Sequence, residues 1–163
     1  MAKITRIGYG QVEPNHLSAQ RTGQIYAQLP ANDEIEVLEN GMFVKYDYAN
    51  KEVNFSGEGE FMLVLNEVKL YDERETYKDF AMKVENYVGG VMVPRVFKTN
   101  VGDIYTTNMV DSKIDMVAGT TKLAPGTDGV LTTAGQDAEM IWKVIKVYTM
   151  ADGQAAVKLQ RIK

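Results

Sequence analysis

The sequence has little of the chemistry on which most enzymes rely. Its 163 residues include no cysteine, one histidine (His16), one tryptophan (Trp142) and three serines. Without cysteine, a chain forms no disulfide and no thiolate metal site, and most protein catalysis depends on a positioned histidine, cysteine, serine or carboxylate pair. We therefore expect a binding or structural protein rather than an enzyme, with no cofactor and no bound metal.

The charge and hydropathy patterns argue against two classes of partner. No apolar run approaches the roughly 20 residues of a membrane-spanning helix, and residues 1–7 lack the apolar core of a secretion signal. Lysine and arginine number 18 against 22 aspartate and glutamate, so the net charge is −4. Nucleic-acid binding needs clustered basic residues. We expect no nucleic-acid partner, no membrane partner and synthesis in the cytoplasm.

Carboxylates are the one plentiful catalytic group, but their spacing matches no known site. The acidic segments 33–39 and 72–75 lack a recognisable ligand spacing, although carboxylates can bind hard cations and paired acids can cleave glycosidic bonds. His16 has no second histidine or cysteine with which to hold a metal. We interpret these groups as solvated strand faces, turns and a polar loop.

From about residue 34, short runs of β-branched and aromatic residues alternate with polar residues and are separated by turns that contain glycine or asparagine. The pattern predicts strands at 34–38, 42–48, 53–55, 61–65, 104–110, 130–132, 140–150 and 155–162. Short strands at intervals of about 8–12 residues are typical of a sandwich or barrel. We expect a mainly β fold, a compact sandwich or barrel of seven or more short strands, with at most one short helix.

The strand at 140–150 is the strongest of these predictions. Alternation places four side chains on one of its faces: Trp142, Val144, Lys146 and Tyr148. A helix over 137–148 is the alternative, but its β-branched residues weigh against it. The Asp152-Gly153 pair predicts a type I′ turn into the closing strand.

Residues 71–88 are compatible with two structures. Asp72 and Glu75 have the spacing of a helix capping box, and apolar residues follow at helical spacing. Phe80, Met82 and Val84 also alternate as they would in a strand. We favour a loop followed by a strand from about residue 79, and the helix stays open as the alternative.

Residues 1–30 differ from the rest of the chain. Isolated hydrophobic residues lie there among glycine and proline, without a sustained period of 2 or 3.6. This pattern predicts an extended N-terminal arm that needs another surface to bury its apolar side chains, followed by a single β domain at 31–163. A first strand and loop of the same domain is the alternative. The expected partner-contact residues are Ile4, Ile7, Tyr9, Val12 and Leu17.

Three stretches near the C-terminus resemble capsid decoration (cement) proteins of tailed bacteriophages. They are a strand entry followed by Gly-Asp within 94–108, a glycine-rich turn before a short strand at 122–132, and the closing strands at 142–148 and 157–162. The resemblance implies a structural virion protein, made in the host cytoplasm, that binds the outer surface of an icosahedral capsid and stabilises it. The implied partners are the major capsid protein and other copies of the chain.

Two other functions are also compatible with the sequence. One is a second structural role, as a head-fibre base, a head–tail joining protein or a tail-tube component, which self-assembly into rings or tubes without a capsid would favour. The other is a carbohydrate-binding or hydrolytic β module that uses aspartate and glutamate, with exposed tyrosines and Trp142 as the platform for a sugar.

Overall fold

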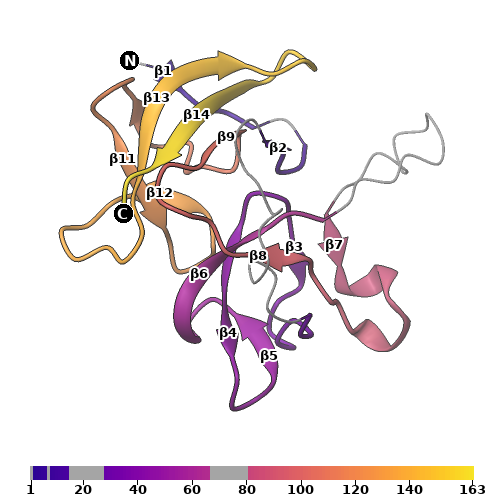
Figure 1. The fold of residues 1–163 in the computed structure, drawn as a ribbon. Coiled ribbons are helices and arrows are strands. Elements are labelled where there is room, and N and C mark those ends of the chain that lie inside the picture. Colours follow the sequence, from indigo (N-terminus) through magenta and orange to yellow (C-terminus); the bar gives the residue numbers. More distant parts are fainter. Residues whose placement is uncertain (1, 7, 15–27, 67–80) are drawn as a thin grey trace.

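The computed structural model describes residues 2–6, 8–14, 28–66 and 81–163. Ile7, His16, Leu17 and residues 71–80 lie outside the described residues. The described part contains fourteen β-strands and two short 3-10 helices (Figure 1). In chain order they are β1 (Ala2–Lys3), β2 (Val12–Glu13), β3 (Val37–Leu38), β4 (Phe43–Asp47), β5 (Glu52–Asn54), β6 (Glu58–Val64), β7 (Met82–Lys83), η2 (Val84–Asn86), η3 (Val88–Gly90), β8 (Val96–Phe97), β9 (Ile104–Thr107), β10 (Asp115–Met116), β11 (Lys122–Pro125), β12 (Leu131–Thr133), β13 (Trp142–Thr149) and β14 (Ala155–Arg161).

Two antiparallel sheets form the body of the protein. The six-stranded sheet has the order β12-β11-β13-β14-β9-β2, and the four-stranded sheet has the order β5-β4-β6-β8. Two shorter antiparallel pairs join β1 to β10 and β3 to β7. In Figure 1 the six-stranded sheet occupies the upper part of the view and the four-stranded sheet the lower part. The prediction of a mainly β fold with seven or more short strands is confirmed.

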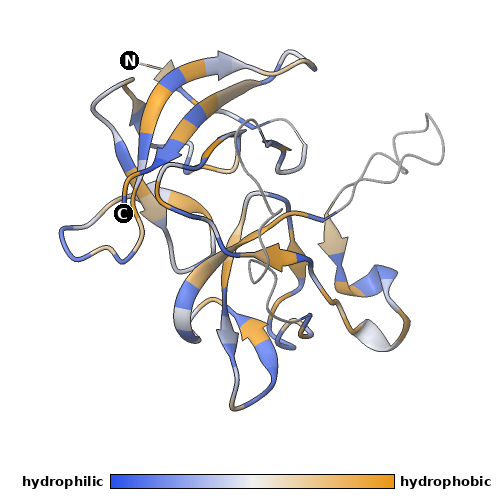
Figure 2. Ribbon diagram, in the orientation of Figure 1, coloured by the Kyte–Doolittle hydropathy of each residue, from blue (hydrophilic) through white to orange (hydrophobic). Residues whose placement is uncertain are grey.

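Two hydrophobic cores lie on opposite faces of the four-stranded sheet. On β4, Phe43 packs in the first core, whereas Val44 and Tyr46 pack in the second. Successive side chains of a strand point to opposite faces of its sheet, so β4 lies between the two cores. Figure 2 shows hydrophobic residues on these strands and on the six-stranded sheet. The inner side chains of the six-stranded sheet, Trp142 among them, complete the first core.

A β-bulge in β13 changes the predicted facing of its side chains. The register between β13 and β14 shifts after Val144, so Ile145 is an extra residue in β13. Beyond the bulge, Val147 packs against the first core and Lys146 is exposed. The prediction that Lys146 shares a face with Trp142 and Val144 is therefore wrong, because the bulge exchanges the faces of all later residues.

The hairpin between β13 and β14 is confirmed, but its turn is not of the predicted type. A type I′ turn needs a positive φ at both central residues, and of Asp152 and Gly153 only Gly153 has one, at 84°. The Asp152 carboxylate accepts the backbone N–H of Gln154 at 3.0 Å. This hydrogen bond is the main cause that lowers the pKa of Asp152, so the loop is held by a local polar contact.

Three other boundaries differ from the prediction. β6 begins at Glu58, before the predicted strand at 61–65, and β11 lies in a segment that is rich in turn residues. The strand expected from about residue 79 ends at Lys83, where η2 begins. Local composition indicates turns at glycine and proline, but it does not show which backbone groups find a partner strand elsewhere in the chain.

Two buried polar groups in the first core have no hydrogen-bond partner among the described residues: the Tyr105 hydroxyl and Trp142 Nε1. The two rings meet edge-on, with their centroids 4.8 Å apart. An unpartnered buried polar group costs about 1–3 kcal/mol. Burial also raises the pKa of Tyr105 well above its usual value, because the phenolate would lose its hydration.

Replacing Tyr105 with phenylalanine is expected to leave stability unchanged or to raise it by about 1 kcal/mol, since the ring stays and the unpartnered hydroxyl goes. The wild type should also lose stability relative to Y105F as the pH rises above about 10, because only the unfolded state ionises Tyr105 there. Urea unfolding at neutral pH and at about pH 10.5 measures both effects. A loss of more than about 1 kcal/mol at neutral pH would show that the hydroxyl is hydrogen-bonded.

Candidate protein-binding surface

The structure describes three of the five predicted contact residues, and it does not place these three on one exposed surface. Ile4 is 1% exposed and belongs to the first core, and Val12 lies in β2 and packs against the same core. Tyr9 is half-buried, and Ile7 and Leu17 lie outside the described residues. Ile4 and Val12 are therefore buried on the chain's own body. This corrects the expectation that they need another protein, and it matches the alternative of a first strand in the same domain.

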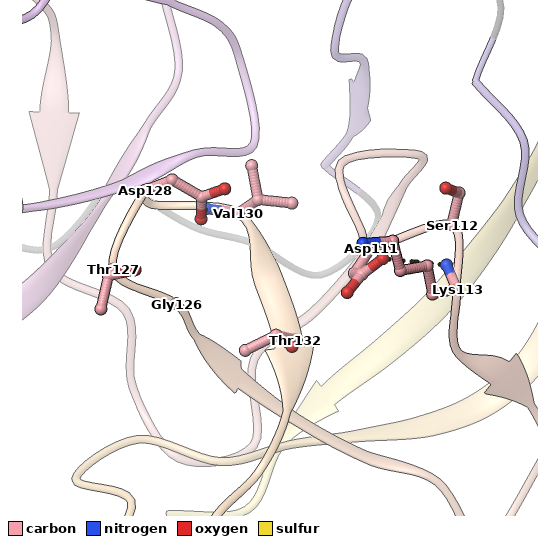
Figure 3. Close-up of a pocket in the computed structure, with 8 residues that line it drawn as sticks. All are labelled: Asp111, Ser112, Lys113, Gly126, Thr127, Asp128, Val130 and Thr132. Carbon is pink, nitrogen blue, oxygen red and sulfur yellow. Dashed lines mark hydrogen bonds between the residues drawn. The ribbon is translucent and has the colours of Figure 1, made fainter.

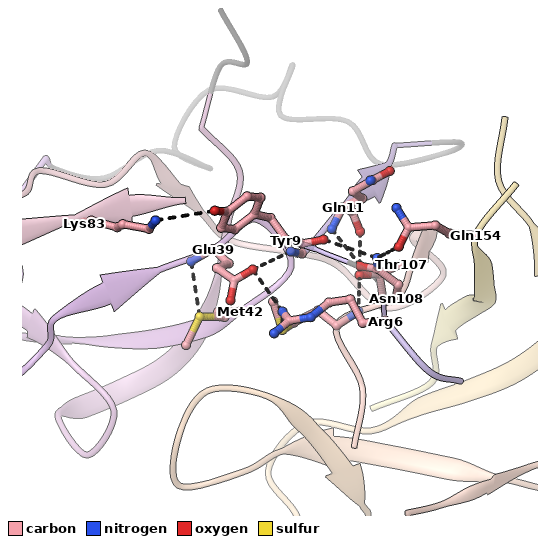
Figure 4. A network of polar contacts seen from close by, with 11 residues as sticks. Arg6, Tyr9, Gln11, Glu39, Met42, Lys83, Thr107, Asn108 and Gln154 are labelled. Carbon is pink, nitrogen blue, oxygen red and sulfur yellow. Dashed lines mark hydrogen bonds and ion pairs between the residues drawn. The ribbon is translucent and has the colours of Figure 1, made fainter. Parts of the chain in front are cut away.

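A polar network holds the described N-terminal residues against the body (Figure 4). The Glu39 carboxylate accepts hydrogen bonds from Arg6, at 2.9 Å, and from the backbone N–H of Gly10. The side-chain oxygen of Asn108 accepts the N–H of Gln11 at 2.7 Å. Asn108 is 97 residues from Gln11 in the sequence, so no local pattern could have shown that this segment docks.

A cluster of exposed apolar side chains lies just after β7, in the segment that projects at the right of Figure 1. Exposed large hydrophobic residues are unremarkable when they are single, but a group of them marks an interaction site. We call this group the 84–93 segment; its members and their exposed fractions are Val84 (38%), Tyr87 (38%), Val88 (102%), Val91 (53%) and Val93 (43%).

Buried methionines anchor the 84–93 segment at its start and near its end. Met82 and Met92 are 7% and 2% exposed and both belong to the second core. The N–H of Val84 donates to the carbonyl of Glu36 at 3.0 Å, and the N–H of Ala31 donates to the carbonyl of Met92 at 2.7 Å. The apolar side chains between these anchors are therefore presented to solvent on a fixed base.

Of the three predicted contact residues that the structure describes, Tyr9 lies beside this base. The Lys83 ammonium, on β7, donates to the Tyr9 hydroxyl at 3.4 Å and lies 5.2 Å from the centre of its ring. The other members of the surface were missed. The alternation of Phe80, Met82 and Val84 predicted a strand, and periodicity indicates which residues share a face without showing whether anything covers that face.

A polar surface pocket of about 420 Å³ lies between the β9–β10 loop and the β11–β12 hairpin (Figure 3). Asp111 accepts the backbone N–H of Lys113 at 2.9 Å, and Asp128 accepts that of Val130 at 3.1 Å. Each carboxylate thus holds its own turn. Among the described residues, no group of three or more histidine, cysteine, aspartate or glutamate side chains is placed to hold a metal. The pocket thus offers polar contacts from its lining residues.

The structure corrects one part of the carbohydrate hypothesis. Trp142 is fully buried in the first core, with its ring 6.0 Å from that of Phe43. It cannot form a stacking platform for a sugar, and sugar-dependent quenching of this residue is not expected. Tyr48, which is 60% exposed, is the aromatic residue of the described chain most open to solvent.

Comparison with known proteins adds no relative: no family model, no curated protein and no solved structure matches this chain. Within the described residues, no helix is long and apolar enough to span a membrane.

Proposed function

We propose that this chain is a non-enzymatic structural virion protein that binds the outer surface of an icosahedral phage capsid and stabilises it. The observation that carries the proposal is the 84–93 segment, whose apolar side chains are exposed although two buried methionines anchor it. Such a surface is suited to contact with another protein. The resemblance of residues 94–162 to capsid decoration proteins supports the choice of partner.

The proposal moves the capsid contact away from the N-terminal segment. Ile4 and Val12 are engaged in the chain's own core, so the contact we propose consists of the 84–93 segment, with Tyr9 at its base. The partners are the major capsid protein and other copies of this chain. A shell offers many identical sites, and simultaneous contacts strengthen a modest affinity at each one.

Serine in place of Val88 and Val91 is expected to weaken binding to undecorated phage capsid shells at least about tenfold. Burying a valine side chain contributes about 1.5 kcal/mol, of which only part appears as affinity, and 1.4 kcal/mol corresponds to a factor of ten. Size-exclusion chromatography with light scattering, on mixtures with shells, measures the bound fraction. Val101→Ser is the matched control, because Val101 is 67% exposed and lies outside the segment.

Two outcomes separate this proposal from its rivals. Equal shell binding by the double variant and by the control would remove the 84–93 segment from the contact. Closed rings or tubes that form without shells at physiological salt would favour the head–tail joining or tail-tube role instead.

A further inference from the structure

The outer face of the six-stranded sheet carries lysines that lie opposite one another. Lys122 of β11 pairs with Lys143 of β13, and Lys146 of β13 pairs with Lys158 of β14. Lys143 itself pairs with Gln160, which is two residues from Lys158 on β14 and so shares its face. All four lysines therefore lie on the face opposite the buried Leu159. We call it the lysine face.

These lysines are not neutralised within the described chain. None of the four forms an ion pair with a described residue, and Lys122 and Lys146 are exposed. Two of the ammonium groups, of Lys146 and Lys158, lie 5.9 Å and 5.3 Å from the centre of the Tyr148 ring. Like charges directly opposite each other destabilise a sheet, so the arrangement costs stability in the isolated chain.

The opposite charge is concentrated elsewhere in the same chain. Residues 31–66 contain eight acidic and two basic side chains, a net charge of −6 in a protein of net charge −4. Asp33, Glu34 and Glu36 of this region are exposed. They precede or flank β3, in the lower part of Figure 1, whereas β13 and β14 lie at its top.

We propose that the lysine face binds the acidic 31–66 region of a second copy of this chain. The inference rests on that part of the proposed function in which copies contact one another, and it assigns the contacting surfaces. Charge complementarity selects the occupant, because the chain carries both halves of the match. The contact is weak in free solution, where salt screens exposed charges, and effective where a shell holds copies side by side.

A nucleic acid fits the lysine face less well than a second copy does. A long polyanion would extend beyond the four lysines, and the negative net charge of the chain would repel the part that lies outside them. Tyr148 and Ile104 lie among the lysines, and a mixture of apolar and basic side chains is typical of protein interfaces.

Charge reversal of one lysine from each pair tests the proposal. At an ionic strength of about 20 mM the mass of the wild type is expected to rise with concentration, and at about 300 mM to return to the 18.2 kDa of the monomer. K143E/K158E should remain monomeric at both salts. The control R95E/K113E has the same net charge, and its two exposed positions lie outside both the lysine face and the 31–66 region, so it should associate as the wild type does.

The same variant separates loss of contact from loss of folding. Each substitution in K143E/K158E turns a Lys–Lys pair into a Lys–Glu pair, so the melting temperature should rise while association is lost. If K143E/K158E melted below the wild type and no longer associated, the opposed lysines of the wild type would stabilise the fold. That result would contradict the account. Wild-type protein that stays monomeric at low salt would overturn the proposal.

A mixing experiment checks the acidic side of the contact. E34K/E36K keeps the lysine face and should be monomeric alone, but should form a 1:1 dimer with K143E/K158E. No dimer in the mixture would overturn the assignment of the 31–66 region. Co-elution of the wild type with a single-stranded DNA oligonucleotide, without self-association, would assign the lysine face to nucleic acid and also overturn it. V88S/V91S should still self-associate, so failure of shell binding and failure of self-association are separate results.

Discussion

Replacing Gly129 with alanine is expected to destabilise the protein by about 2–5 kcal/mol. Gly129 has a φ of 78°, where an L-residue costs roughly 1–2 kcal/mol. Its added Cβ would lie 2.6 Å from the carbonyl oxygen of Phe43 and 2.7 Å from the ring of Phe55, and overpacking of this kind costs about 1–3 kcal/mol. The loss would be a large part of the 5–15 kcal/mol that stabilises a typical protein.

The position of Gly129 explains why the effect should be global. Its carbonyl accepts the N–H of Phe43 at 2.8 Å, so the β11–β12 hairpin of one sheet is bonded to β4 of the other. Gly59→Ala is the matched control, because Gly59 has a φ of 85° and nothing within 4 Å of the added Cβ. Urea unfolding of both variants isolates the clash. Equal losses would show that the two sheets are not in close contact at Gly129.

Replacing Trp142 with alanine is expected to cost about 3–5 kcal/mol. Trp142 is fully buried, meets Tyr105 edge-on at 4.8 Å and lies 6.0 Å from Phe43 of β4. Its ring thus fills the first core between the two sheets, and aromatic pairs of this geometry contribute about 0.5–1.5 kcal/mol each beyond the area that they bury.

Trp142→Phe is the control for this prediction. It keeps an aromatic ring and removes the unpartnered Nε1, so we expect a loss below about 1.5 kcal/mol. Because Trp142 is the single tryptophan, unfolding has to be followed by circular dichroism. A loss of less than about 1 kcal/mol in the alanine variant would place Trp142 outside the core and contradict the packing described here.

Part of the fold could be predicted because its causes are local. Apolar residues alternate with polar or β-branched residues in β4, β13 and β14, and turn residues flank each strand. All three strands were predicted close to their observed bounds. The bulge at Ile145 was missed because an extra residue is visible only in the register with β14. The docking of residues 2–6 and 8–14 was missed because its partners, such as Asn108, lie far along the chain.

The candidate surface was harder to predict than the fold. Hydrophobicity indicates burial, so the alternation of Phe80, Met82 and Val84 predicted a strand there rather than an exposed site. What separates them from a buried strand is their anchoring: Met82 and Met92 occupy the second core, while Val88 and Val91 between them do not. The sequence contains Gly89 and Gly90, whose positive φ angles turn the chain at that point. It does not show that the side chains on either side of them are exposed.

Oxidative footprinting of the protein, free and bound to capsid shells, tests the central claim most directly. Tyr87 in the 84–93 segment is 38% exposed, and Tyr48 on β4's hairpin with β5 is 60% exposed, so each reports on its own surface in one sample. We predict that, in K143E/K158E, which lacks the proposed contact between copies, shell binding lowers the oxidation rate of Tyr87 several-fold and leaves that of Tyr48, in the 31–66 region, unchanged. Protection of Tyr48 with Tyr87 unchanged, or full shell occupancy with neither tyrosine protected, would contradict the assignment of the 84–93 segment as the capsid contact.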